Sequence, residues 1–108
     1  VRKQTKLLTR LLRPMTLLSH VGEIRQCGLM VGIELVQDRT TRTPYPLEMR
    51  IGHRVAQACR KGGLLMRPLG NVIALVPPLS TSPQELTKMV AILHSAIVDV
   101  TEGSASPA

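Results

Sequence analysis

Aromatic residues are almost absent from this 108-residue chain, which has no Trp, no Phe and a single Tyr. Proteins that bind single-stranded nucleic acids stack bases on aromatic rings, so the composition argues against that class of protein. The hydrophobic content of 44% must therefore come mostly from aliphatic side chains. A chain of this length and content is sufficient for one domain with one modest core.

Cysteine is scarce as well, and long apolar runs are missing. Cys27 and Cys59 lack the C-x-x-C spacing of zinc sites, so we expect two small core residues in a reducing compartment, without disulfide or metal. No segment has the basic start and apolar run of a signal peptide, or the length of a membrane span. Because the chain also begins at Val1 without an initiator Met, we expect a cytoplasmic fragment of a longer protein.

Acidic residues are absent from the first thirteen positions, which hold five of the fourteen Lys and Arg residues. The net charge of the chain is +7. Helical spacing places these cations opposite a leucine stripe, which predicts an amphipathic helix. A solvated helix face, or a segment lying on an acidic part of a larger protein, explains the charge better than nucleic acid or membrane binding. An independent basic binding module remains the alternative. The cations are Arg2, Lys3, Lys6, Arg10 and Arg13, of which the last four lie at helical spacing, and the leucines are Leu7, Leu8, Leu11 and Leu12.

Hydrophobic periodicity predicts an α+β domain in which helices pack on one side of a small sheet. We expect a leading helix within residues 1–20 that Pro14 ends or kinks, the domain proper at 21–102, and a disordered tail at 103–108. The predicted elements of the domain are a strand pair over 23–36 that turns near Gly28, an exposed loop at 37–46, a helix whose stripe is Leu47, Ile51, Val55 and Cys59, strands at 64–66 and 72–76, and a last helix opened by the capping box Ser82-Pro83-Gln84-Glu85.

Residues that could carry catalysis are not grouped in the sequence. His20, His53 and His94 lie far apart, without a carboxylate or thiol at ligand spacing, so we interpret them as structural. The chain contains no G-x-S-x-G, P-loop or dinucleotide-binding motif. A self-contained enzyme is therefore not expected.

Arg67 is the strongest candidate for a binding residue. It follows an apolar run, and Pro68 favours an extended backbone at the residue before it. A guanidinium that projects from a rigid strand end is suited to hold a carboxylate through two parallel hydrogen bonds. The alternative is a structural arginine that pairs with Glu34 or Asp38.

Two runs, RQCGLMVGIEL at 25–35 and RPLGNVIALVPPL at 67–79, resemble the terminal domain of class III aminotransferases, which are pyridoxal-phosphate enzymes of fold type I. The likeness extends over 21–101, and the segments 39–46, 67–71 and 80–82 are most similar to the members that act in biotin biosynthesis. The resemblance implies a small C-terminal domain with the order helix, hairpin, helix, two strands, helix. It also implies that this domain packs against missing N-terminal and large domains in a cytoplasmic homodimer.

The resemblance also implies a reaction and a site. Members of this kind transfer an amino group from S-adenosylmethionine or lysine to 8-amino-7-oxononanoate, giving 7,8-diaminononanoate. In them the arginine that matches Arg67 binds the substrate carboxylate, and we expect Pro68, Leu69, Gly70 and Ala74 to line the pocket. Some members carry a tyrosine at the position of Ala74, so the amino donor stays open, and an ω-amino acid:pyruvate-type transaminase remains the alternative.

The cofactor implied by the resemblance is pyridoxal 5'-phosphate, held by the missing large domain. Its chemistry requires a Schiff-base lysine and an aspartate partner for the ring nitrogen. The lysines of this chain do not match the family's lysine motif, so we expect no catalytic residue here and no activity from the chain alone. These lysines are Lys3, Lys6, Lys61 and Lys88.

Overall fold

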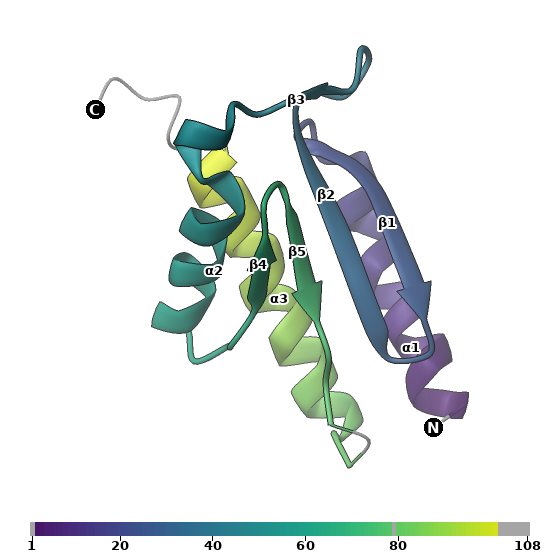
Figure 1. Ribbon diagram of the computed structural model, residues 1–108. Coiled ribbons are helices and arrows are strands. Elements are labelled where there is room, and N and C mark those ends of the chain that lie inside the picture. Colours follow the sequence, from purple (N-terminus) through teal and green to yellow (C-terminus); the bar gives the residue numbers. More distant parts are fainter. Residues whose placement is uncertain (1, 79, 102–108) are drawn as a thin grey trace.

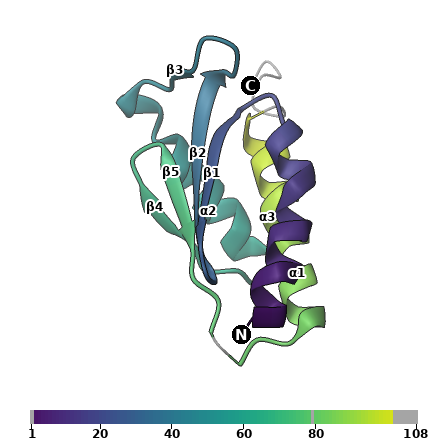
Figure 2. The same ribbon diagram turned by 90° about the vertical axis from the view of Figure 1, so that its right-hand side faces the viewer.

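The computed structural model describes residues 2–78 and 80–101, which form an antiparallel sheet with helices on one face (Figures 1 and 2). The strand order is β1-β2-β5-β4, and β3 pairs with β2 off this path. This arrangement confirms the predicted α+β class. The helices are α1 (Arg2–Leu12), α2 (Ile51–Lys61) and α3 (Pro83–Thr101), with 3-10 helices η1 (Arg13–Leu17) and η2 (Leu47–Met49); the strands are β1 (Val21–Cys27), β2 (Met30–Asp38), β3 (Thr43–Pro44), β4 (Arg67–Leu69) and β5 (Val72–Leu75).

An aliphatic core fills the space between the sheet and the helices. Ile24, Ile33 and Ile73 are cross-strand partners on β1, β2 and β5, and residues paired in this way point to the same face of a sheet. Ile33 and Ile73 are fully buried. The predicted alternation along β2 is confirmed, because its buried residues alternate with exposed or half-buried ones as far as Leu35.

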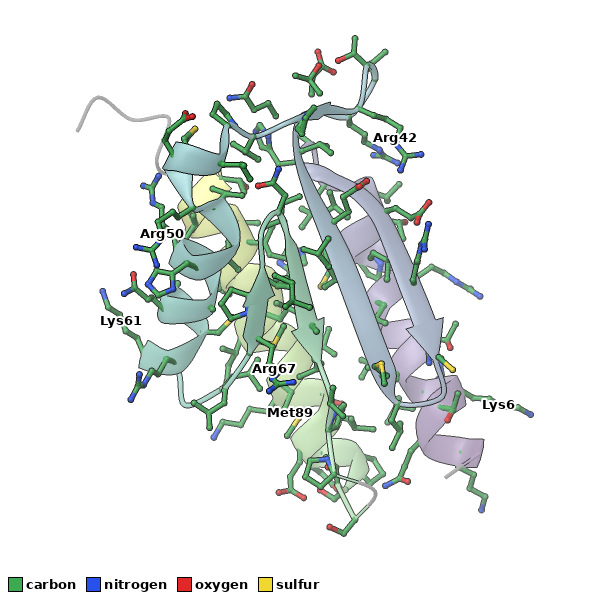
Figure 3. All side chains as sticks on the ribbon, in the orientation of Figure 1. Lys6, Arg42, Arg50, Lys61, Arg67 and Met89 are labelled. Atoms are coloured by element: carbon green, nitrogen blue, oxygen red, sulfur yellow. The ribbon has the colours of Figure 1, made fainter. Side chains whose placement is uncertain are left out.

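The first helix behaves as its charge pattern predicts. It ends at Leu12, and Pro14 lies in the first turn of the 3-10 helix that follows. Leu8 and Leu12 are buried in the core shared with the sheet, whereas Lys3 and Lys6 are exposed (Figure 3). Figure 2 shows α1 lying alongside α3. None of the helices in the described part of the chain has the length and apolar character that a bilayer span requires.

The predicted strand at 64–66 is wrong, because the strand begins at Arg67. Leu64 is buried, but Leu65 is 78% exposed. The reason lies in the turn: Leu69 pairs with Val72, and Gly70 between them has a φ of 65°. A glycine at positive φ in the first central position permits a two-residue hairpin, so the residues just before it pair instead of forming a longer loop.

The predicted exposed loop at 37–46 is partly wrong. β2 continues to Asp38, and β3 pairs with it. Tyr45 is buried, and its hydroxyl lies 3.1 Å from Nδ1 of His20. A buried tyrosine requires such a partner for its hydroxyl, and the half-buried His20 provides it, in keeping with a structural role.

Three smaller expectations meet different outcomes. Leu47 is 76% exposed and lies outside the buried stripe, because Arg50 adopts a left-handed conformation (φ 47°) that separates η2 from α2. Cys27 is exposed at the end of β1, whereas Cys59 is buried as expected. The tail at 103–108 lies outside the described residues.

The capping box predicted at the start of α3 is confirmed. The backbone N–H of Glu85 donates to Oγ of Ser82 over 3.1 Å, and the N–H of Ser82 donates to Oε1 of Glu85 over 3.0 Å. Replacing a serine N-cap by alanine costs about 1 kcal/mol. We expect Ser82→Ala to lower the free energy of unfolding by that amount in denaturant titrations. Ser95→Ala, an exposed change within the same helix, serves as the control, and equal effects of both would contradict the cap.

The same cap makes stability depend on pH. Hydrogen bonds from Ser82 hold the pKa of the Glu85 carboxyl below its ordinary value of 4.5. A depressed folded pKa stabilises the fold fully above the ordinary value, and the contribution is lost as the pH falls through the folded pKa. We therefore expect the stability difference between the native chain and Glu85→Gln to shrink below about pH 4.5. A difference that stays constant in this range would contradict the assignment.

The two thiols differ in environment and should differ in reactivity. Burial raises the pKa of the Cys59 thiol to about 11, and the side chain is fully buried. Because the thiolate is the reactive form, we expect Cys59 to resist alkylation until the chain unfolds. In a Cys27→Ser variant, labelling followed by mass spectrometry should rise only with the unfolding transition. Labelling of native protein at the denatured rate would contradict the buried position.

Candidate functional site

Arg67 lies on the face of the sheet that the helices leave open. It pairs with Ala74 on β5, which pairs with Gly32 on β2, which in turn pairs with Arg25 on β1. This row is one residue out of step with the buried isoleucine row, so it faces the opposite side. Figure 3 draws Arg67 at the end of β4 that lies away from the Gly70 turn.

The charge of Arg67 is not neutralised within the described residues, where it makes neither an ion pair nor a side-chain hydrogen bond. The carboxylates considered as its structural partners are engaged elsewhere. Oε1 of Glu34 accepts a hydrogen bond from Arg42 over 3.0 Å, and Oδ1 of Asp38 accepts one from the N–H of Thr40 over 2.8 Å. Arg67 is therefore exposed and free to receive an anion from outside the described chain.

The other residues expected to line the pocket divide between the two faces. Leu69 lies two positions after Arg67 on the same face and is 65% exposed. Ala74 is half-buried and directly opposite Arg67. Pro68 pairs with Ile73 and faces the helices, while Gly70 lies in the turn. The structure thus brings Arg67, Leu69 and Ala74 together and places Pro68 on the other side.

A neutral charge cluster borders this face on the β1 side. Arg25 bonds to Glu23, and Arg42 reaches both Glu34 and Glu23. The hydrogen bond from Arg25 holds the pKa of Glu23 below its usual value, and the bond to Glu34 raises the pKa of Arg42. Two cations and two anions cancel here, and pairs this exposed contribute little to stability. A shallow depression beside them is lined by Glu23, Arg25, Gly32, Glu34 and Val72.

The open face also carries apolar side chains without cover. Met30 on β2 and Leu69 on β4 are exposed, and so is Val76 directly after β5. Exposed apolar groups gathered on one surface are typical of an interaction or ligand-binding site. A single uncompensated guanidinium beside such groups can hold a ligand that joins a carboxylate to an alkyl chain.

Groups for covalent or metal chemistry do not converge on this face. Residues 2–78 and 80–101 contain no cluster of His, Cys, Asp or Glu that could hold a metal ion. The described lysines are exposed and lie on helices, which pack on the face of the sheet opposite to Arg67 (Figure 2). These lysines are Lys3, Lys6, Lys61 and Lys88. The groups that the open face offers are a guanidinium and apolar side chains, which suit the binding and orientation of a ligand.

The sequence did not indicate that Gly32 and Ala74 lie in one row with Arg67. Pairing within each hairpin follows from local turns, but the pairing of β2 with β5 joins segments separated by a helix and a loop. The only signal for it was the apolar content of both strands. The register, which puts Gly32 opposite Ala74, is visible only in the structure.

Comparison with known proteins gives a consistent result. The family model described as Aminotransferase class-III matches residues 1–97. The chain is 50% identical to the adenosylmethionine-8-amino-7-oxononanoate aminotransferase of Nitratidesulfovibrio vulgaris over 97% of this chain and 19% of the relative. It is 45% identical to the protein of that name from Methanocaldococcus jannaschii, over 90% of this chain and 21% of the relative.

Solved structures show the same relationship. The crystal structure of the Methanocaldococcus jannaschii protein superposes with a TM-score of 0.88 over 91% of this chain and 22% of that one. An omega-transferase from Vibrio fluvialis, 28% identical, superposes with a TM-score of 0.93 over 97% of this chain and 25% of that one. The chain spans about a fifth of the length of the curated relatives it matches. Because the family model covers residues 1–97, the resemblance seen in the two sequence runs is confirmed, and the chain belongs to the class-III aminotransferase family.

Proposed function

We propose that this chain provides the carboxylate-binding side of the active site in an aminotransferase that converts 8-amino-7-oxononanoate to 7,8-diaminononanoate in biotin biosynthesis. Relatives that are 41–50% identical carry the name adenosylmethionine-8-amino-7-oxononanoate aminotransferase. The observation that carries the proposal is the uncompensated Arg67 guanidinium on an apolar open face.

The surroundings of Arg67 suit a long-chain keto acid. The guanidinium fork can pair with a carboxylate through two parallel hydrogen bonds. Ala74 has a small side chain and Gly32 has none, so the row of the sheet that continues from Arg67 leaves room for a ligand. Leu69 offers an apolar surface for methylene groups. 8-Amino-7-oxononanoate joins a carboxylate to its reacting carbonyl through such an alkyl chain. Anchoring the carboxylate at Arg67 therefore sets where the carbonyl lies.

The rest of the enzyme must provide the reacting groups. Pyridoxal 5'-phosphate supplies the electron sink that amino transfer requires. Since none of the described lysines faces Arg67, we place the cofactor and its lysine in the remaining part of the protein, which we expect to cover the open face as part of a homodimer. In that assembly this chain binds the substrate, orients it and excludes water from the site.

The role of Arg67 is tested in the full-length enzyme. Removing one partner of a buried charge pair costs about 2–5 kcal/mol. We expect Arg67→Ala to lower kcat/KM for 8-amino-7-oxononanoate by the factor that corresponds to this free energy, mainly through a higher KM. Arg67→Lys should lower kcat/KM less, because a point charge remains. Arg25→Ala, at the far end of the same row, is the control. Unchanged substrate saturation in Arg67→Ala would show that Arg67 is structural.

A second candidate is an ω-amino acid:pyruvate-type transaminase. It is favoured by the superposition with the omega-transferase and by Ala74, which lacks a hydroxyl opposite Arg67. The full-length enzyme should be assayed with 8-amino-7-oxononanoate and with pyruvate as acceptors, and with S-adenosylmethionine and lysine as separate donors. Turnover with pyruvate, and none with 8-amino-7-oxononanoate, would replace the first proposal by the second.

A further inference from the structure

We propose that Gly52 and Asn71 are positioning residues for Arg67, because they hold the turn of the β4–β5 hairpin from two sides. Gly52 follows Ile51 at the start of α2 and is buried. Figure 1 shows the beginning of α2 close to the end of the hairpin where β4 turns into β5. The inference rests on the proposed role of Arg67 in binding the substrate carboxylate.

The contact at Gly52 leaves no room for a side chain. A Cβ at this position would lie 2.4 Å from the carbonyl oxygen of Gly70 and 3.5 Å from that of Val72. The nearest atoms belong to the backbone, so no side-chain rotation can relieve the clash. Any larger residue must therefore push the helix and the turn apart.

The backbone conformation does not explain a glycine at this position. Gly52 lies within an α-helix and is not among the glycines with positive φ. The close approach to Gly70 is the feature of the described structure that accounts for a glycine here.

Asn71 holds the turn from the other side. Its side-chain Nδ2 donates a hydrogen bond to the backbone carbonyl oxygen of Tyr45 over 3.0 Å. Its backbone carbonyl oxygen accepts a hydrogen bond from the N–H of Leu35 over 2.8 Å. The turn is thus fixed between α2 on one side and β2 with the buried Tyr45 on the other. It cannot move away from a side chain at position 52 without breaking these bonds.

The placement of Arg67 depends directly on this turn. β4 has three residues, pairs with β5 alone among the described strands and follows residues outside any strand. It also packs against α2, the helix that begins beside the turn. A displacement between α2 and the turn therefore acts on the whole short strand and moves the guanidinium three residues before Gly70.

The test compares two glycine substitutions in the full-length enzyme. Gly52→Ala disturbs the hairpin turn, whereas Gly62→Ala places a Cβ 2.9 Å from Cγ2 of Ile92 at the other end of α2, without contact with the turn. Both should lower the Tm. Because a misplacement of about 1 Å can cost 10²-fold in rate, we expect Gly52→Ala to raise KM for 8-amino-7-oxononanoate at least about tenfold, with cofactor absorbance retained. Gly62→Ala should leave KM unchanged, and equal KM values in the two variants would overturn the inference.

A second variant decides the case if Gly52→Ala does not fold. Asn71→Ala removes the hydrogen bond to Tyr45 without adding any atom, so it should express normally and raise KM severalfold. A KM equal to that of the unaltered enzyme would overturn the positioning role.

Double variants separate this inference from the proposed function. If Gly52 and Asn71 act through Arg67, then combining either change with Arg67→Ala should add nothing further to KM. Additive effects would show that they act independently of Arg67. If Arg67→Ala alone leaves KM unchanged, the proposed function itself fails. If Arg67→Ala raises KM and the other two variants do not, only the positioning role fails.

Discussion

The pairing of β2 with β5 is the constraint on which the rest of the structure depends. It joins two hairpins that are separated in sequence by a helix, and it sets Ile33 opposite Ile73 in the core. The same register sets Gly32 opposite Ala74 on the other face, beside Arg67. A slip by one residue would exchange the two faces, so the same register determines both the burial of the isoleucines and the exposure of the open face.

The two faces of the sheet are consequently specialised. One face is covered by three helices, and its side chains belong to the aliphatic core that stabilises the fold. The other has a neutral cluster of four charges at the β1 side and a single uncompensated guanidinium at the β4 side, with apolar groups between. This asymmetry suits the proposed site, because Arg67 lies on the open face and the packed scaffold lies behind it.

Local chemistry made much of the fold predictable from sequence. The capping box at Ser82 and the alternation along β2 depend on residues a few positions apart, and both are present. The strand that begins at Arg67 is predicted too early, at 64–66, because Leu65 is apolar yet exposed. Hydropathy alone cannot distinguish an exposed apolar residue from a buried one. The burial of Tyr45 and the contact between Gly52 and Gly70 arise between distant segments. The resemblance singled out Arg67, whose role stays a prediction, whereas the residues that share its row follow only from the three-dimensional register.

Pro68 has a consequence beyond the geometry of the binding face. It lies in the last strand of the order β1-β2-β5-β4, whose outer edge has no partner among the described strands. Unpaired edges of this kind are templates for the addition of a strand from another molecule, and a proline removes one of the donors such an addition needs. A strand added at this edge would therefore find one backbone donor fewer at Pro68, which disfavours self-association of the chain through its sheet edge.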